Sequence, residues 1–314
     1  MPMEPRPITP IRTRFIKLFY RRVRQIPQAW FLGCVTRRAK LFTMKRVAFV
    51  LFLAVGLTGC TMLGLRSNTG RYVVIHYYPY TVSTVRTIAK PMPEYDNWNE
   101  MRMRLDLERL ANLNVDIVMV TVEPEGLQSQ GHALRYLRFV DLAAKYPFKV
   151  AFMADGRRAS LFDIRKFGEW CEQNLPNRLG YFHWQGQPLV EFRNALNAAN
   201  YSNPSLTIRR TDGGNEWAWG PGKKYKPETS PNGEQVMVFA GLLSNGDRPE
   251  LGFSMKRENG SCVRRQFRQA AATNARFICI ASYNDFYEGS FVEPNTFDND
   301  SVFKALRSEI AWFK

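Results

Sequence analysis

The stretch FICIASYNDFYEGSFVEP, residues 277–294, joins an apolar run to the densest cluster of polar and aromatic residues in the chain. The first five residues are apolar, which is typical of a buried strand. Asp285 and Glu288 follow this run directly. In a parallel eight-stranded barrel, the side chains that perform chemistry lie at the C-terminal ends of the strands. The stretch therefore predicts a barrel strand that leads into a functional loop.

The chain before this stretch repeats the pattern of a short apolar strand followed by an amphipathic helix. Strand signals, in which β-branched and aromatic residues lie between turn formers, occur at 72–78, 116–122, 149–154, 189–192, 206–210, 235–239 and 277–282, with a weaker one at 216–219. Helical spacing of apolar residues occurs at 98–113, 133–145, 161–174, 262–273 and 301–313. This alternation predicts a parallel sheet with helices outside it.

The number of strands indicates an α/β fold, a (β/α)8 TIM barrel that forms a single domain over residues 71–314. About 250 residues suffice for such a barrel, and no Pro/Ser-rich linker divides the segment. A doubly wound open sheet is the competing architecture. Its dinucleotide-binding form lacks support, because no G-x-G-x-x-G follows the first strand.

The positive charge of the chain lies mostly at its N-terminal end. Residues 1–59 hold 12 Lys and Arg against one acid, so they carry +11 of the total charge of +16. The remaining residues carry only +5 and have neither a basic stripe nor zinc-type cysteine spacing. Nucleic acid is therefore excluded as the expected partner.

A short basic start and an apolar run at residues 44–59 are typical of a signal peptide. The run ends in Leu57-Thr58-Gly59-Cys60, which resembles the lipobox of bacterial lipoproteins. That resemblance implies a lipid on Cys60, a short tether over 60–70, and a location in the bacterial cell envelope, anchored to the outer membrane or at the periplasmic face. Residues 1–43 are then an extension before the signal, which we attribute to a start codon assigned too early.

Asp285 and Glu288 are three residues apart, so a turn or short helix would place both carboxylates on one side of the chain. Two carboxylates beside aromatic platforms are typical of glycoside hydrolysis. One protonates the leaving oxygen, and the other activates water, attacks the sugar or removes a proton from it. An isolated D-x-x-E is far more often a capping box or a pair of solvated loop acids.

The surrounding residues resemble the terminal signature of the glycoside hydrolase family 99-like group. The matches are Ser282, Asn284, Glu288, Gly289, Glu293 and Pro294. Tyr77-Tyr78-Pro79-Tyr80 is similar to the family's first-strand element, and 181–190 and 257–260 are similar to two further stretches. The resemblance covers residues 72–313, and its specific part is 282–294.

The resemblance implies an endo-α-mannosidase or mannanase barrel that retains configuration through a 1,2-anhydro sugar. The first signature acid, here Asp285, would remove the 2-hydroxyl proton, and Glu288 would act as acid and then as base. The family has Glu at the first position, so Asp285 shortens the reach by about one C–C bond, and a shift on the order of 1 Å can cost roughly 100-fold in rate. Asp is normal there in the related family 71 α-1,3-glucanases, so an α-glucan is an alternative to an α-mannan.

Further residues near predicted strand ends are candidates for binding the sugar: Tyr78, Glu123, His183, Trp217, Trp219, Asn284 and Tyr287. No metal or other cofactor is expected, since the three histidines are dispersed. The expected partners are an oligo- or polysaccharide and, through Cys60, a membrane; we expect a monomer. A non-catalytic glycan-binding lipoprotein with a degenerate barrel is the alternative function. Whether Cys171, Cys262 and Cys279 form a disulfide stays open.

Overall fold

The computed structural model describes residues 70–79, 89–95, 97–156, 158–193, 201–211, 227, 229–242, 255–286 and 289–314. All of them lie within the unit Gly64–Lys314. The expected extension, signal peptide and lipid-bearing Cys60 lie outside the described residues, so they remain predictions.

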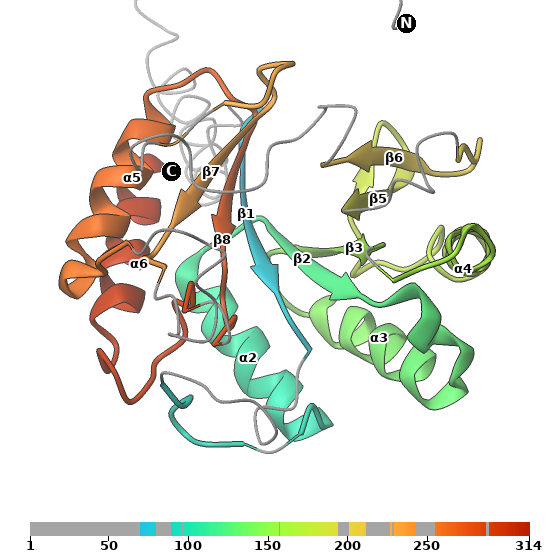
Figure 1. The fold of residues 1–314 in the computed structure, drawn as a ribbon, viewed down its shortest axis with the longest axis horizontal. Helices are drawn as coiled ribbons and strands as arrows, with labels where there is room; N and C mark the ends of the chain where they lie inside the picture. Colours follow the sequence, from blue (N-terminus) through green and yellow to red (C-terminus); the bar gives the residue numbers. More distant parts are fainter. Residues whose placement is uncertain are drawn as a thin grey trace, which may run out of the picture. The chain divides into compact units, whose positions relative to one another are not determined.

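Seven strands run parallel to one another and form the framework of this unit (Figure 1). They are β1 (Tyr72–Tyr77), β2 (Ile117–Val122), β3 (Lys149–Asp155), β5 (Gln187–Arg193), β6 (Thr207–Arg210), β7 (Gln235–Phe239) and β8 (Phe277–Ala281). Their spatial order is β7-β8-β1-β2-β3-β5-β6, and the short β4 (His183–Trp184) pairs antiparallel with β5. All seven main strand predictions are confirmed. The weaker signal at 216–219 lies outside the described residues, in the segment that connects β6 to β7, the two ends of this path.

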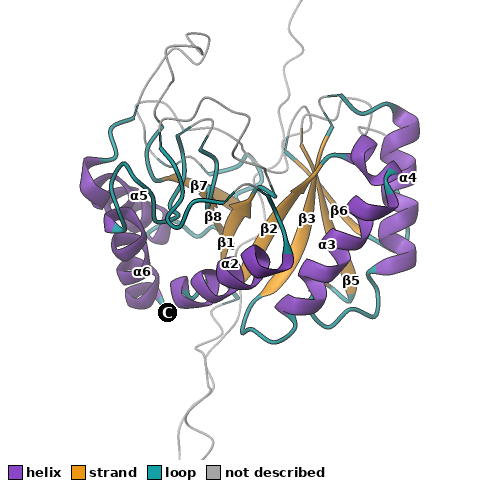
Figure 2. Ribbon diagram, turned by 90° about the horizontal axis from the view of Figure 1, so that it is seen from below, coloured by secondary structure: helices purple, strands orange, loops and turns teal. Residues whose placement is uncertain are grey.

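Helices follow the strands along the chain and lie outside them (Figure 2). They are α2 (Glu100–Leu113), α3 (Gln130–Ala143), α4 (Leu161–Asn174), α5 (Ser261–Ala271) and α6 (Ser301–Phe313), with 3-10 turns η2 (Pro124–Gln128) and η6 (Glu258–Gly260). This order of parallel strands and outer helices is that of a (β/α)8 barrel. The helices agree with the sequence prediction to within three residues at each end.

Alternation along each strand separates the core into two apolar clusters. In β1, Val73 and Ile75 belong to the cluster that packs against the helices, whereas Val74 belongs to the cluster inside the sheet. Met119 and Met153 join Val74 in the inner cluster. Because both faces of a parallel sheet are covered, its strands are near-continuous apolar runs, and this explains why they were readable from the sequence.

Aromatic rings close the end of the sheet at which the strands begin. Tyr72 and Phe277, the first residues of β1 and β8, stack with centroids 5.5 Å apart. Trp184 lies 5.1 Å from Phe277 and 5.9 Å from Tyr72. It arrives there on the β4–β5 hairpin, whose two-residue turn has positive φ at Gln185 and Gly186. An active site must therefore lie at the opposite end of the barrel, where the strands end. We call this end the mouth.

Two remaining findings concern the helices and the cysteines of the described residues. None of their helices has the length and apolar character needed to cross a membrane. Cys171, Cys262 and Cys279 are buried free thiols, which answers the question of a disulfide among them. Burial raises the pKa of the Cys171 and Cys279 thiols well above the ordinary value.

Candidate active site

The mouth is formed where β8 passes into residues 282–294. Beyond the end of β8, the Tyr283 N–H donates to His76 O at 2.7 Å, so the chain still follows β1. The Asn284 side chain then pairs with the backbone of Tyr78 in both directions, from Nδ2 to Tyr78 O at 2.7 Å and from Tyr78 N to Oδ1 at 2.8 Å. The predicted residues Asn284 and Tyr78 are thus brought together. The Asn284 amide bonds to backbone, so it shapes the mouth.

Asp285 is the next residue after Asn284 and is 4% exposed. Its N–H donates to Ser282 Oγ at 2.9 Å, and its carbonyl accepts from the Ser290 N–H at 3.2 Å. These two bonds close the turn that holds Asp285 at the C-terminal end of β8. Glu288 and Tyr287 lie outside the described residues, as do Trp217 and Trp219, so the roles assigned to these four residues remain predictions.

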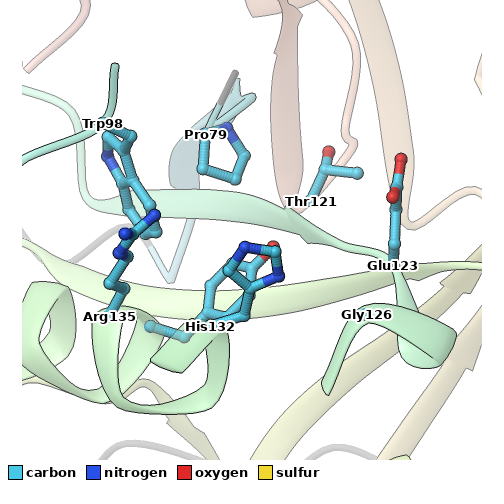
Figure 3. A pocket seen from close by; sticks show the side chains of 8 residues that line it. Pro79, Trp98, Thr121, Glu123, Gly126, His132 and Arg135 are labelled. Atoms are coloured by element: carbon cyan, nitrogen blue, oxygen red, sulfur yellow. The ribbon is translucent and has the colours of Figure 1, made fainter. Parts of the chain in front are cut away.

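A cavity of about 280 Å³ opens beside this mouth, at the ends of β1 and β2 (Figure 3). The predicted binding residue Glu123 lines it, one residue after β2. The other lining residues are Pro79, Trp98, Thr121, Gly126, His132, Arg135 and Tyr136. Pro79 directly follows Tyr78, whose backbone pairs with Asn284. The cavity therefore lies next to the residues that form the mouth.

His183 does not lie with the other predicted site residues. It opens β4, before the start of β5, and its ring nitrogens lie 3.2 Å from Tyr181 O and 3.0 Å from Pro176 O. The hairpin that places Trp184 against Tyr72 carries His183 to the end of the sheet where the strands begin. Its predicted contact with sugar in the mouth is therefore withdrawn.

Two charged residues inside the sheet were not predicted from the sequence. Glu191 and Arg193 alternate with the outward-facing Val190 and Phe192 in β5, so they face inward, and both are buried. Arg193 Nη1 donates to the Tyr78 hydroxyl at 3.1 Å, which ties β5 to the mouth. The available signal was two charges at alternate positions in an otherwise apolar strand, because such charges are expensive to bury without partners.

His76 also faces inward, at an alternate position from Val74 of the inner cluster, and is fully buried. Burial, together with the Arg193 cation, lowers the pKa of His76 to about 3. The imidazole is therefore neutral at ordinary pH. No cluster of His, Cys, Asp and Glu that could hold a metal ion occurs among the described residues.

Comparisons with known proteins found similarity in structure alone. No family model matches the sequence, and no curated protein matches it. Among solved structures, the family 99 endo-α-mannosidase of Bacteroides thetaiotaomicron, in complex with bis-tris propane, is similar with a TM-score of 0.62. The similarity is at 14% identity over 77% of this chain and 97% of that one.

The chain has the fold of a family 99 glycoside hydrolase.

A second structure of the same Bacteroides endo-α-mannosidase has a TM-score of 0.61 at 13% identity, over 77% of this chain and 97% of that one. A glycoside hydrolase-like protein has a TM-score of 0.51 at 11% identity, over 76% and 94% of the two chains. The resemblance inferred from residues 282–294 is thus confirmed for the fold, and with it the single (β/α)8 barrel. At such identities the likeness shows architecture only.

The last acid of the family 99-like signature, Glu293, is buried against α2. Arg102 of α2 donates to Glu293 Oε1, and Arg109 Nη1 lies 3.2 Å from the same oxygen. Arg102 also pairs with Asp106 at 2.6 Å. Burial, reinforced by the Asp106 charge, raises the pKa of Glu293 to about 8. Glu293 thus fastens the loop after β8 to the helix after β1, outside the mouth.

Proposed function

We propose that the chain is a glycoside hydrolase that acts on α-linked glycans, α-mannan-like or α-glucan-like. The observation that carries the proposal is the family 99 fold combined with a signature acid, Asp285, held at the C-terminal end of β8. In barrels of this kind that end bears the active site. Two of the solved structures with a similar fold are of an endo-α-mannosidase, which supports an α-linked substrate.

The proposed chemistry uses Asp285 and Glu288 as a pair. Asp285 accepts the proton of the sugar 2-hydroxyl as that oxygen closes on the anomeric carbon. Glu288 gives a proton to the departing oxygen as the glycosidic bond breaks. Water then attacks the anomeric carbon and opens the anhydro ring, as Glu288 accepts a proton from the water and Asp285 returns its proton to the sugar O2. General acid catalysis of this type contributes typically 10²–10⁴-fold.

The test is hydrolysis of a panel of α-mannans and α-glucans by the purified protein and by Glu288→Gln. The amide keeps the shape of the carboxyl group but cannot cycle a proton, so turnover should fall by at least about 100-fold while glycan binding persists. Equal rates for the variant and the wild-type protein would refute the assignment. Binding without hydrolysis in both proteins would favour the non-catalytic glycan-binding alternative.

Asp285→Glu separates the two substrate classes. This change restores the longer side chain found in family 99, so a gain on α-mannan would assign the protein to α-mannan chemistry. A loss on every substrate would favour the shorter geometry of the α-1,3-glucanases. Asp285→Asn serves as the control, because it removes the base in either case and should be inactive on both.

We also propose that the enzyme acts in the bacterial cell envelope, anchored through Cys60. The support is the sequence 44–60 alone, with its basic start, apolar run and Leu-Thr-Gly-Cys exit. Extracellular or periplasmic placement would bring the mouth to the polysaccharides that such an enzyme needs.

A further inference from the structure

The cavity beside the mouth contains polar groups that the protein itself does not use. Trp98 and Thr121 are each 6% exposed, and the buried Nε1 of Trp98 and Oγ1 of Thr121 have no hydrogen-bond partner among the described residues. Both side chains line the cavity (Figure 3). A buried donor or hydroxyl without a partner costs roughly 1–3 kcal/mol. Two such groups at one cavity indicate that an external partner satisfies them.

Three exposed side chains complete the same wall. Glu123, His132 and Arg135 line the cavity, and none of them makes a side-chain hydrogen bond or ion pair within the part of the chain that the structure describes. Arg138, one turn along α3 from Arg135, instead pairs with Glu100 at 2.9 Å. The neighbouring cation on the helix is thus engaged in the protein, while Arg135 is left for a ligand.

The aromatic wall is rigid and already in place. Trp98 packs between Tyr136 and Phe139, with ring centroids 5.4 and 5.5 Å away. Because neighbouring rings fix the indole, its N–H is held in one position and no side-chain freedom is lost when a ligand binds. Ligand pockets usually measure roughly 300–1,000 Å³. At about 280 Å³, this cavity has room for one six-membered ring but not for a chain of sugars.

We propose that this cavity is a subsite for a single neutral pyranose unit of the glycan. The proposal rests on the proposed function and adds to it a second binding position beside the mouth. Each sugar hydroxyl both donates and accepts, which suits a wall that combines the Trp98 N–H, the Thr121 hydroxyl, the Glu123 carboxylate and the Arg135 guanidinium. Because Glu123 offsets the charge of Arg135, a neutral hexose is favoured over a uronic acid.

The test follows the Trp98 indole N–H directly and needs no hydrolysis. In ¹⁵N-labelled protein, the Trp98 signal is identified by its absence in Trp98→Phe. Methyl α-mannopyranoside and methyl α-glucopyranoside are then titrated to millimolar concentrations. At least one of them should move the Trp98 signal saturably, while the signal of the exposed Trp312 on α6 stays in place.

Variants locate the binding on the named side chains. Thr121→Val and Arg135→Gln should each weaken the titration roughly 10-fold, as expected for one lost polar contact. Arg165→Gln, an exposed arginine on α4, should leave it unchanged. A Trp98 signal that does not respond to either sugar would overturn the subsite, and so would a wild-type affinity in both Thr121→Val and Arg135→Gln. Equally tight binding of methyl glucuronide would overturn its preference for neutral sugars.

The outcomes for the subsite and for the proposed function are distinguishable. Hydrolysis of a polysaccharide with no response at Trp98 refutes the subsite alone. A saturable Trp98 response in a protein that hydrolyses no glycan supports the subsite and refutes the enzyme.

Discussion

His76 illustrates how a single residue acquires its properties from the barrel interior. The side chain is fully buried within the sheet, and its environment lowers the pKa to about 3, chiefly by desolvation and secondarily through Arg193. The pKa of a histidine in the unfolded chain is near 6.5. Below that pH the unfolded chain therefore binds a proton that the folded chain does not bind. Protonation therefore favours unfolding.

We expect the free energy of unfolding to fall as the pH decreases from about 6.5 towards 3, with each unit of pKa difference worth about 1.4 kcal/mol. The measurement is urea unfolding at several pH values for the wild-type protein and for His76→Asn. Effects of the carboxylates are common to both proteins and cancel in the comparison. The variant should show the shallower decline; parallel curves would contradict a neutral buried imidazole.

At the scale of elements, Arg257 holds the loop that follows β8. Its Nε lies 2.5 Å from Asp298 Oδ2, and its Nη2 donates to Phe291 O at 2.7 Å. Nη1 reaches Gly289 O at 3.3 Å, and the guanidinium lies 4.1 Å from the centre of the Phe291 ring. Gly289 is the residue next to Glu288 in the chain, so one buried arginine holds the chain directly after the proposed acid.

Arg257→Gln should therefore lower both stability and turnover. Loss of one partner from a buried ion pair costs about 3–5 kcal/mol, because Asp298 is left buried and unpaired. Thermal unfolding and kcat on an accepted glycan are the measurements, with Arg265→Gln as the matched control on α5. Arg265 pairs with Glu258 at the surface, where such a pair is worth at most about 1 kcal/mol. If the two variants were equally stable, the loop would not depend on Arg257.

Helix α4 begins with a capping box. The N–H of Asp163 donates to Ser160 Oγ at 3.2 Å, and the N–H of Ser160 donates to Asp163 Oδ2 at 2.8 Å. Ser160→Ala should cost about 1 kcal/mol in the free energy of unfolding. Ser129 occupies the same position before α3 without a cap bond, so Ser129→Ala is the control and should cost little. Equal losses in urea unfolding would show that the cap bond is not the cause.

At the scale of the whole molecule, charge separates the chain into two parts. The basic excess lies before Cys60, whereas the barrel segment is only mildly basic. In the envelope location that we propose, the basic flank beside the apolar run would stay on the cytoplasmic side during export, and the barrel would lie on the other side.

Replacing Cys60 by Ser should release the protein from membranes, because the thioether that carries the lipid cannot form on a hydroxyl. The measurement is fractionation of cells expressing the wild-type protein and the variant, with Cys171→Ser as a control that alters a thiol within the barrel. Identical membrane fractions for Cys60→Ser and the wild-type protein would count against lipidation.

The sequence by itself determined the strands, the helices and the barrel class. Buried parallel strands such as Ile117–Val122 are continuous apolar runs, and their length and spacing do not depend on distant residues. The motif at 282–294 likewise indicated the family of folds, because the order of its residues is a local property.

Only the tertiary structure decided which side chains meet. Asn284 and Tyr78 are 206 positions apart in the chain, yet they form the clamp at the mouth. Trp98, Thr121 and Arg135 come from three separate segments and line one cavity. The two-residue turn after Trp184 instead places His183 at the opposite end of the sheet. Periodicity tells which face a residue takes along its own element. Contacts between elements depend on how strands and helices that are distant in the chain pack together, and no local pattern records that.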